Sequence, residues 1–310
     1  QLSKQYRRFS RIIEQKGPEL VLGPLSQTVG GLLKDLRFLR LAQKAGIRTL
    51  AHLHGGELDR TIERSPKPFR AYIERCIRGT EGTIVLADRF RPIFRPYLPE
   101  ERIFTVPNGI PIEHDGNERR SPPPFRILFL SNPLRRKGVE DVIVASEQLR
   151  EQGYEIQLDV AGEWFEPSFQ KACMDKVDRN ELPVRFHPPL EPPAKKELLE
   201  SAHLFLLPPR GPEGLPLALI EALGHGLPII STDRGAIPET VEEGWNGHLI
   251  PEREPSAIAE RVSELIEDPE RREAFGKRSR ERYESSFTEE RLSENLYHCW
   301  DSLLKLPSRG

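Results

Sequence analysis

The chain has 310 residues with 46 Lys and Arg, 48 Asp and Glu, and a formal net charge of −2. This length is enough for two domains that each bury a core. Its three cysteines (Cys76, Cys173 and Cys299) are scattered and odd in number, which argues against a disulfide framework and fits a reducing compartment. No apolar run approaches membrane-spanning length and no secretory signal is visible, so we expect a cytoplasmic protein.

The charge is unevenly distributed along the chain. Residues 1–120 hold 22 Lys and Arg against 14 Asp and Glu, whereas the remainder holds 24 against 34. A basic first half, with cations and aromatics interleaved in Arg89–Tyr97, suits peripheral contact with the anionic inner face of a membrane. Such runs also occur in nucleic-acid binders, but nothing else here supports that class, and solvated helix faces would explain any single cluster equally well.

Strand-like segments in the first third are apolar runs that end in turn residues, and they comprise residues 20–24, 49–54, 81–87 and 102–110. The second of them carries His52 and His54 and breaks off at Gly55 and Gly56. A His-x-His pair can bind a metal, but no third ligand at suitable spacing is visible. Residues 114–124 are polar and rich in proline, which is typical of a linker.

The rest of the chain alternates apolar strands with helix-like stretches. The predicted strands are 125–130, 156–161, 184–186, 204–207, 228–230 and 247–250, and helical spacing covers residues 139–149 and 194–202. This alternation predicts a doubly wound parallel sheet, in which ligands bind at the carboxyl ends of the strands. Four polar or glycine positions fall at such ends, namely Lys137, Glu163, Glu213 and Gly235.

Glu213 and Glu221 enclose the start of a predicted helix. Glu213 lies in the loop after the strand 204–207, and Glu221 lies roughly 10 Å further along the helix axis. The first-turn N–H groups and the positive end of the helix dipole lie between them. This arrangement suits a diphosphate with a hydroxyl-rich ring at each end, as in a nucleotide sugar. The alternative is a helix with a capping Glu213 and a solvent-facing Glu221.

Two further helices are predicted near the end of the chain, at residues 268–283 and 288–304. In the second, Leu292, Leu296, Trp300 and Leu303 recur at helical spacing. Such a stripe by itself predicts core packing.

The Glu-x7-Glu spacing resembles the motif of retaining glycosyltransferases of the GT-B fold, in particular the large family 4, and the resemblance covers about residues 125–287. Lys137-Gly138, the loop Gly235–Glu239 and the ending Val106–Ile110 support it. The resemblance implies two doubly wound Rossmann-like α/β domains that face a cleft, at residues 1–118 and 119–310, with the helix at about 288–305 crossing back to the first domain. The first domain is short by comparison, as if it lacked an initial β-α unit, and its exposed sheet edge would favour self-association or a partner.

The resemblance also implies roles for individual residues. Glu213 would hold hydroxyls of the donor sugar, and Glu221 would hold the ribose of the nucleotide. His54, in the first domain, would face the same donor sugar across the cleft. His52 could equally be a core histidine. Further donor contacts would come from Arg136, Lys137, Gly138, Glu163, Gly214, Leu215, Pro216 and Gly235. Asn132 stands where the family usually has an arginine, so either Asn132 makes a neutral hydrogen bond or Arg135 or Arg136 supplies the second positive charge.

The function that the resemblance implies is transfer of a hexose from a nucleotide-diphosphate sugar to a glycan or lipid-linked acceptor, with retention and without a cofactor or bound metal. Surface polysaccharide or glycolipid synthesis would be its setting. The alternatives are a non-catalytic nucleotide-sugar-binding protein of the same fold, an epimerase, for which extra acid/base carboxylates are not evident, and an interaction scaffold, against which Lys137, Glu213 and Glu221 argue.

Overall fold

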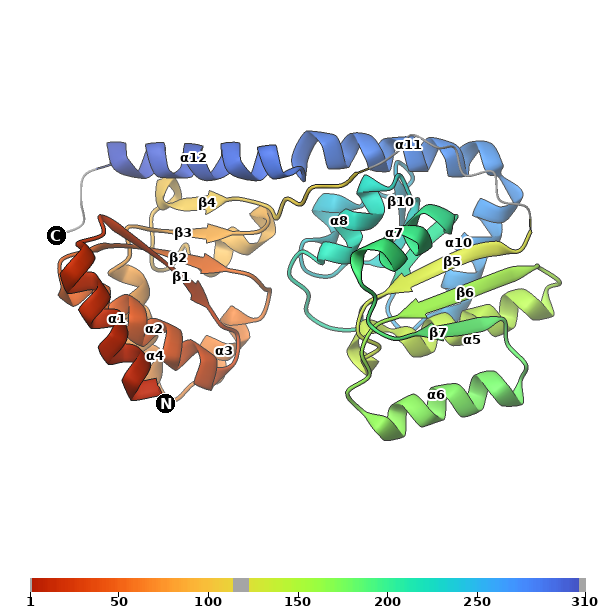
Figure 1. Ribbon diagram of the computed structural model, residues 1–310, viewed down its shortest axis with the longest axis horizontal. Coiled ribbons are helices and arrows are strands. Elements are labelled where there is room, and N and C mark those ends of the chain that lie inside the picture. The colour runs from red at the N-terminus through yellow and green to blue at the C-terminus, as the bar shows by residue number, and fades with distance from the viewer. Residues whose placement is uncertain (1, 114–122, 307–310) are drawn as a thin grey trace. The chain divides into compact units, whose positions relative to one another are not determined.

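The structure is a computed structural model that describes residues 2–113 and 123–306 (Figure 1). The chain divides into two compact units. The first comprises Gln1–Asn108, Glu213–Leu215 and Leu292–Gly310, and the second comprises Gly109–Pro212 and Pro216–Arg291. The expected domain boundary at 118/119 and most of the expected linker at 114–124 lie outside the described residues.

The first unit contains a four-stranded parallel sheet in the order β1-β2-β3-β4 (Figure 1). Its elements are α1 (Leu2–Lys16), β1 (Leu20–Leu25), α2 (Val29–Lys44), β2 (Arg48–Leu53), α3 (Leu58–Arg64), α4 (Lys67–Arg78), β3 (Gly82–Val85), η1 (Asp88–Ile93), η2 (Glu100–Arg102), β4 (Ile103–Thr105) and most of α12 (Glu289–Lys305). The strands therefore follow one another across the sheet in chain order.

The two faces of this sheet are covered from different parts of the chain. Thr49 of β2 accepts a hydrogen bond from Gln43 of α2 at 3.2 Å, so this side chain faces α2. Leu50 is the next residue and therefore points to the opposite face. There it joins a buried cluster that includes Cys299 and Leu303 of α12, and α12 also accepts a hydrogen bond from Arg48 at the Leu303 carbonyl (3.0 Å).

The second unit contains a six-stranded parallel sheet in the order β10-β9-β8-β5-β6-β7. Its elements are β5 (Phe125–Leu130), η3 (Arg135–Lys137), α5 (Val139–Glu151), β6 (Ile156–Ala161), α6 (Pro167–Arg179), β7 (Val184–His187), α7 (Pro192–Ser201), β8 (Leu204–Leu207), α8 (Leu217–Gly224), β9 (Ile229–Thr232), α9 (Ile237–Thr240), β10 (Gly247–Ile250), α10 (Pro255–Glu267) and α11 (Pro269–Ser286). The chain crosses from one side of β5 to the other between β7 and β8, so α5 and α6 lie on one face and α7 and α8 on the other (Figure 1). The switch point lies between β5 and β8, where doubly wound sheets bind ligands.

Three helices of the first unit, α1, α3 and α4, were not predicted from the sequence. The spacing of Tyr6, Phe9 and Ile13 carried a helical signal in α1, and the rings of Tyr6 and Phe9 lie 4.8 and 5.0 Å from the ring of Phe38 in α2. The strand expected over residues 102–110 is shorter than predicted. It ends at Thr105, and the backbone N–H of Val106 still donates a hydrogen bond to the Val85 carbonyl at 2.8 Å.

None of the helices that the described residues form has the length and apolar content needed to cross a membrane.

Neighbouring leucines on α12 provide a test of its role in the first core. Leu303 is 1% exposed and lies in the cluster with Leu50, whereas Leu304 is 64% exposed. We expect Leu303→Ala to lower the free energy of unfolding by about 2–5 kcal/mol, because it removes buried apolar surface and leaves a cavity. We expect Leu304→Ala to change it by less than about 0.5 kcal/mol. Denaturant unfolding of both variants measures the difference, and equal effects would contradict this packing.

Candidate functional site

The loop after β5 lies at the switch point of the second sheet and carries Asn132, Arg136, Lys137 and Gly138. The Oδ1 atom of Asn132 accepts a hydrogen bond from the backbone N–H of Glu163, in the loop after β6, at 3.0 Å. Asn132 thus ties together the ends of β5 and β6, which are neighbouring strands.

Arg135 has a different role from the two cations that follow it. Its guanidinium carbon lies 4.1 Å from the centroid of the buried Phe169 ring, and it pairs with Glu140 and Glu166, both at 3.5 Å. These contacts direct Arg135 toward α5 and α6. The side chain of Lys137 is half-buried and that of Arg136 is exposed.

An arginine that belongs to none of the sequence motifs, Arg210, joins this loop to the loop after β8. Arg210 binds the buried carboxylate of Asp141 through Nε (2.7 Å) and Nη2 (2.5 Å), and Nη1 binds Glu140 at 3.0 Å. Its backbone N–H donates to the carbonyl of Arg136 at 2.8 Å. The hydrogen bond to Asp141 raises the pKa of Arg210, burial opposes this rise, and the charge of Asp141 and the contact with Glu140 raise the pKa further. A bidentate arginine of this kind fixes both partners in geometry.

Gly138 completes the junction between these two loops. Its φ is +79°, and a Cβ atom at this position would overlap the carbonyl oxygen of Pro208. Only glycine allows this conformation and this close approach at once. The sequence contained a cue for the junction, because an arginine in the loop after β8 accompanies two acidic residues in the first turn of α5.

Glu221 lies on α8 between residues that are fully buried. Its neighbours Ile220 and Ala222 are both 0% exposed, and Pro216 forms the N-cap of the helix. The carboxylate of Glu221 pairs with the ammonium group of Lys195 from α7. This partner was not expected from the sequence.

The loop after β9 contains Gly235, whose φ is +54°. Beside it, Arg234 forms an ion pair with Glu252, which follows β10. The loops of Asn132, Glu163 and Gly235 thus all follow the carboxyl ends of strands in the second sheet, as the sequence predicted.

The remaining predicted residues belong to the first unit. His54 directly follows β2, and its ring centroid lies 3.9 Å from that of His52. Gly214 lies against this loop so closely that a Cβ atom would overlap the carbonyl oxygen of His54. The carbonyl oxygen of Leu215 accepts a hydrogen bond from Asn108 at 3.2 Å. Glu213, with 7% exposure, is therefore held next to the histidine pair within this unit.

The histidine pair is electrically neutral at pH 7. The pKa of His52 is lowered from 6.5 to about 4. Burial is the larger cause, and the charge of the adjacent His54 is the smaller one. Burial also lowers the pKa of His54. A neutral imidazole has one donor and one acceptor nitrogen, which suits a hydroxyl-bearing ligand. Among the described residues, no cluster of three His, Cys, Asp or Glu side chains could hold a metal ion.

Two parallel sheets, with loops rich in polar groups at the switch point of the second, define an α/β protein of the GT-B glycosyltransferase fold. Residues 112–282, more than half of the chain, match the family described as glycosyl transferases group 1. The chain belongs to this family, and the prediction of family and fold from sequence is confirmed.

The chain is also similar in sequence to individual proteins. It is 30% identical over 181 residues to spore coat protein SA of Bacillus subtilis, covering 56% of this chain and 48% of that protein. It is 28% identical over 242 residues to the amylovoran biosynthesis glycosyltransferase AmsK of Erwinia amylovora, and the match covers 74% of this chain and 57% of AmsK. The chain thus spans about half the length of the curated relatives that it matches.

Solved structures share the fold at lower identity. The crystal structure of HepE from Anabaena in complex with UDP matches with a TM-score of 0.77 and 17% identity, covering 98% of this chain and 82% of HepE.

The buried His52 predicts a pH dependence of stability. Because its pKa is lowered in the folded state, the unfolded chain binds a proton between pH 6.5 and about 4 that the folded chain does not. The contribution of His52 to stability is therefore fully present above pH 6.5 and is lost as the pH falls toward 4. We expect His52→Gln to reduce the fall in melting temperature over this range. His298→Gln, at an exposed position of α12, serves as the control, and an unchanged fall in His52→Gln would exclude His52 as its source.

The Arg210 junction predicts a loss of stability when its carboxylate partner is neutralised. We expect Asp141→Asn to cost about 1.5–3 kcal/mol of unfolding free energy, the range for hydrogen bonds to charged groups. Lys171→Ala removes an exposed ion pair with Asp175 and should cost less than about 1 kcal/mol. Denaturant unfolding compares the two. Equal costs would mean that the Arg210 junction behaves as an ordinary surface ion pair.

Proposed function

We propose that this protein is a retaining glycosyltransferase that moves a hexose from a nucleotide-diphosphate sugar to a glycan or lipid-linked acceptor. The observation that carries the proposal is the combination of Lys137, at the switch point of the second sheet, with Glu221 on α8 of the same unit. The first supplies a cation for a diphosphate and the second an acceptor for ribose hydroxyls. Membership of the glycosyl transferases group 1 family supports this assignment.

The donor roles follow from the family resemblance and from the local geometry. Lys137 and the N–H groups at the start of α8 bind the diphosphate, with Arg136 and Gly138 beside them. Asn132 and Glu163 line the same rim, already linked by their hydrogen bond. Gly235 lets the loop after β9 approach the donor. HepE, which has the same fold, is described in complex with UDP and with UDP-glucose, and this supports a nucleotide-sugar donor here.

The residues of the first unit act on the transferred sugar. We assign Glu213 to its hydroxyls, with Gly214, Leu215 and Pro216 forming the turn beside it, and His54 to a sugar contact. The neutral state of His54 favours a hydrogen bond with a hydroxyl over an ion pair with the diphosphate.

Transfer proceeds on one face of the sugar in this proposal, with the acceptor entering on the side from which the diphosphate leaves. The leaving phosphate oxygen takes the proton of the acceptor hydroxyl as the new glycosidic bond forms. Lys137 and the α8 N–H groups stabilise the negative charge that develops on the diphosphate. No protein nucleophile takes part.

Synthesis of a surface polysaccharide or glycolipid is the proposed setting. AmsK is named for amylovoran biosynthesis, and the excess of basic residues in the first 120 positions suits an acceptor carried on an anionic membrane.

A second candidate is a protein of this fold that binds nucleotide sugars without turnover. The specific observation in its favour is Asn132, which replaces the usual arginine of the family and uses its carbonyl oxygen in the contact with Glu163. A diphosphate held by one cation fewer is a poorer leaving group.

A ligand screen tests the donor site and separates the two candidates. Melting temperature and calorimetry are measured with UDP, GDP, ADP and their common sugar conjugates, because a ligand of the folded state raises stability by mass action. Stabilisation by one nucleotide series identifies the base, and release of free nucleotide from its sugar conjugate distinguishes an enzyme from a binder. No response to any nucleotide would refute both candidates.

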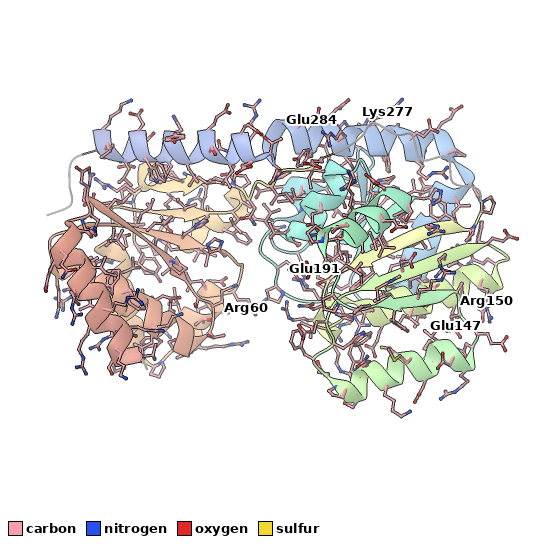
Figure 2. All side chains as sticks on the ribbon, viewed as in Figure 1. Arg60, Glu147, Arg150, Glu191, Lys277 and Glu284 are labelled. Atoms are coloured by element: carbon pink, nitrogen blue, oxygen red, sulfur yellow. The ribbon has the colours of Figure 1, made fainter. Side chains whose placement is uncertain are left out.

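Substitutions in the donor site are expected to slow transfer strongly without unfolding the protein. Lys137→Ala and Glu213→Ala should each lower kcat/KM by about 100-fold or more, since each removes a group that acts on the reacting donor. Lys277→Ala and Glu284→Ala, on α11 (Figure 2), are matched controls expected to retain full activity. Initial rates with the donor found in the screen give the answer, and near-normal rates would remove Lys137 or Glu213 from the site.

A further inference from the structure

The ion pair between Lys195 and Glu221 joins two helices on the same face of the second sheet. Lys195 lies in the first turn of α7, which begins after Glu191, and Figure 2 labels Glu191 on the side of this unit to which β5 and β6 run. Its ammonium group binds Oε1 of Glu221 on α8. The two side chains are 32% and 15% exposed, so the pair is largely withdrawn from solvent.

The backbone beneath Glu221 has little freedom to move. Ile220 and Ala222 on either side of it are completely buried, and Leu223 is as well. Any variation in the position of the carboxylate must therefore come from its own side-chain torsions. An ammonium partner restricts those torsions and fixes which oxygen remains for a ligand.

A carboxylate that binds one lysine still has acceptor capacity. Its two oxygens offer about four lone-pair positions, of which Lys195 uses one on Oε1. The second oxygen can accept a hydrogen bond from a hydroxyl group of a ribose. A ligand without that hydroxyl would leave a largely buried charged acceptor without its donor, which is costly.

We propose that Lys195 is a positioning residue that makes the donor site selective for ribonucleotides over 2′-deoxyribonucleotides. The proposal rests on the assignment of Glu221 to the ribose. Lys195 acts through Glu221, holding its carboxylate so that the free oxygen meets the ribose hydroxyls. The donor class is then a ribonucleoside diphosphate sugar, and donors built on a deoxynucleotide, such as thymidine diphosphate sugars, are disfavoured.

The neighbouring lysine provides a control on the same helix. Lys196 pairs with Glu200 one turn further along α7, at 3.6 Å, and its side chain is 33% exposed, close to the 32% of Lys195. Substituting it removes the same charge from the same helix while the Lys195–Glu221 pair remains.

The experiment measures dissociation constants by calorimetry for UDP, GDP and ADP and for their 2′-deoxy counterparts. We expect the wild-type protein to prefer one ribonucleotide over its deoxy form by about 10- to 100-fold, the ratio that one hydrogen bond to a charged group supplies. In Lys195→Ala this ratio should fall toward one. Lys195→Arg should restore part of it, and Lys196→Ala should keep it unchanged.

The possible outcomes separate the inference from the proposed function. If no diphosphate binds the wild-type protein, the proposed function fails and the inference with it. If one binds and the wild type shows no preference, or Lys195→Ala keeps the preference, the inference alone fails. Equal weakening of both nucleotide forms in Lys195→Ala would also overturn it, because that result indicates a merely structural role. Melting temperatures of all variants establish that they are folded.

Discussion

A parallel sheet must be covered on both faces, and the two units meet this requirement in different ways. In the first sheet the strands follow chain order, so right-handed crossovers place their helices on one face and leave the other to α12. In the second sheet the chain reverses direction between β7 and β8, so its own crossovers cover both faces. The same reversal brings the loops after β5 and β8 together, where Arg210 and Lys137 lie. One constraint thus accounts for the core of one unit and for the candidate site of the other.

Much of the second unit could be predicted because its signals are local. Strands such as Ile156–Ala161 are apolar runs of strand length, and the spacing of Glu213 and Glu221 is read directly along the chain. The contacts Arg210–Asp141 and Lys195–Glu221 could not be predicted in this way. Their partners are 69 and 26 residues apart, and they meet only because of the strand order, which periodicity does not encode. In α1 the helical spacing of Tyr6, Phe9 and Ile13 stands among many basic residues, which obscure the pattern.

Basic residues that look alike in the sequence are different in the structure. Arg135 and Arg210 both have acidic partners, and Arg135 also contacts an aromatic ring, so both serve to hold loops. From their positions near the strand ends alone, Arg135 and Arg210 would both have been interpreted as ligand-binding residues. In the proposed function, the phosphate contacts come instead from the short segment Arg136–Gly138. Likewise, Asn132 keeps a structural hydrogen bond at a position where the family usually has charge.

The contribution of α12 to the first unit has a consequence for the order of folding. Arg48 and its hydrogen-bond partner Leu303 are separated by 255 residues, and most of the second unit is synthesised between them. While the ribosome is still translating that stretch, the apolar face formed by Leu50 and Ile84 has no permanent cover. Domains usually fold in order from the N-terminus during translation. Here the first unit completes its core only after the second unit has been synthesised, and until then the side chains of Leu50 and Ile84 lack the cover of α12.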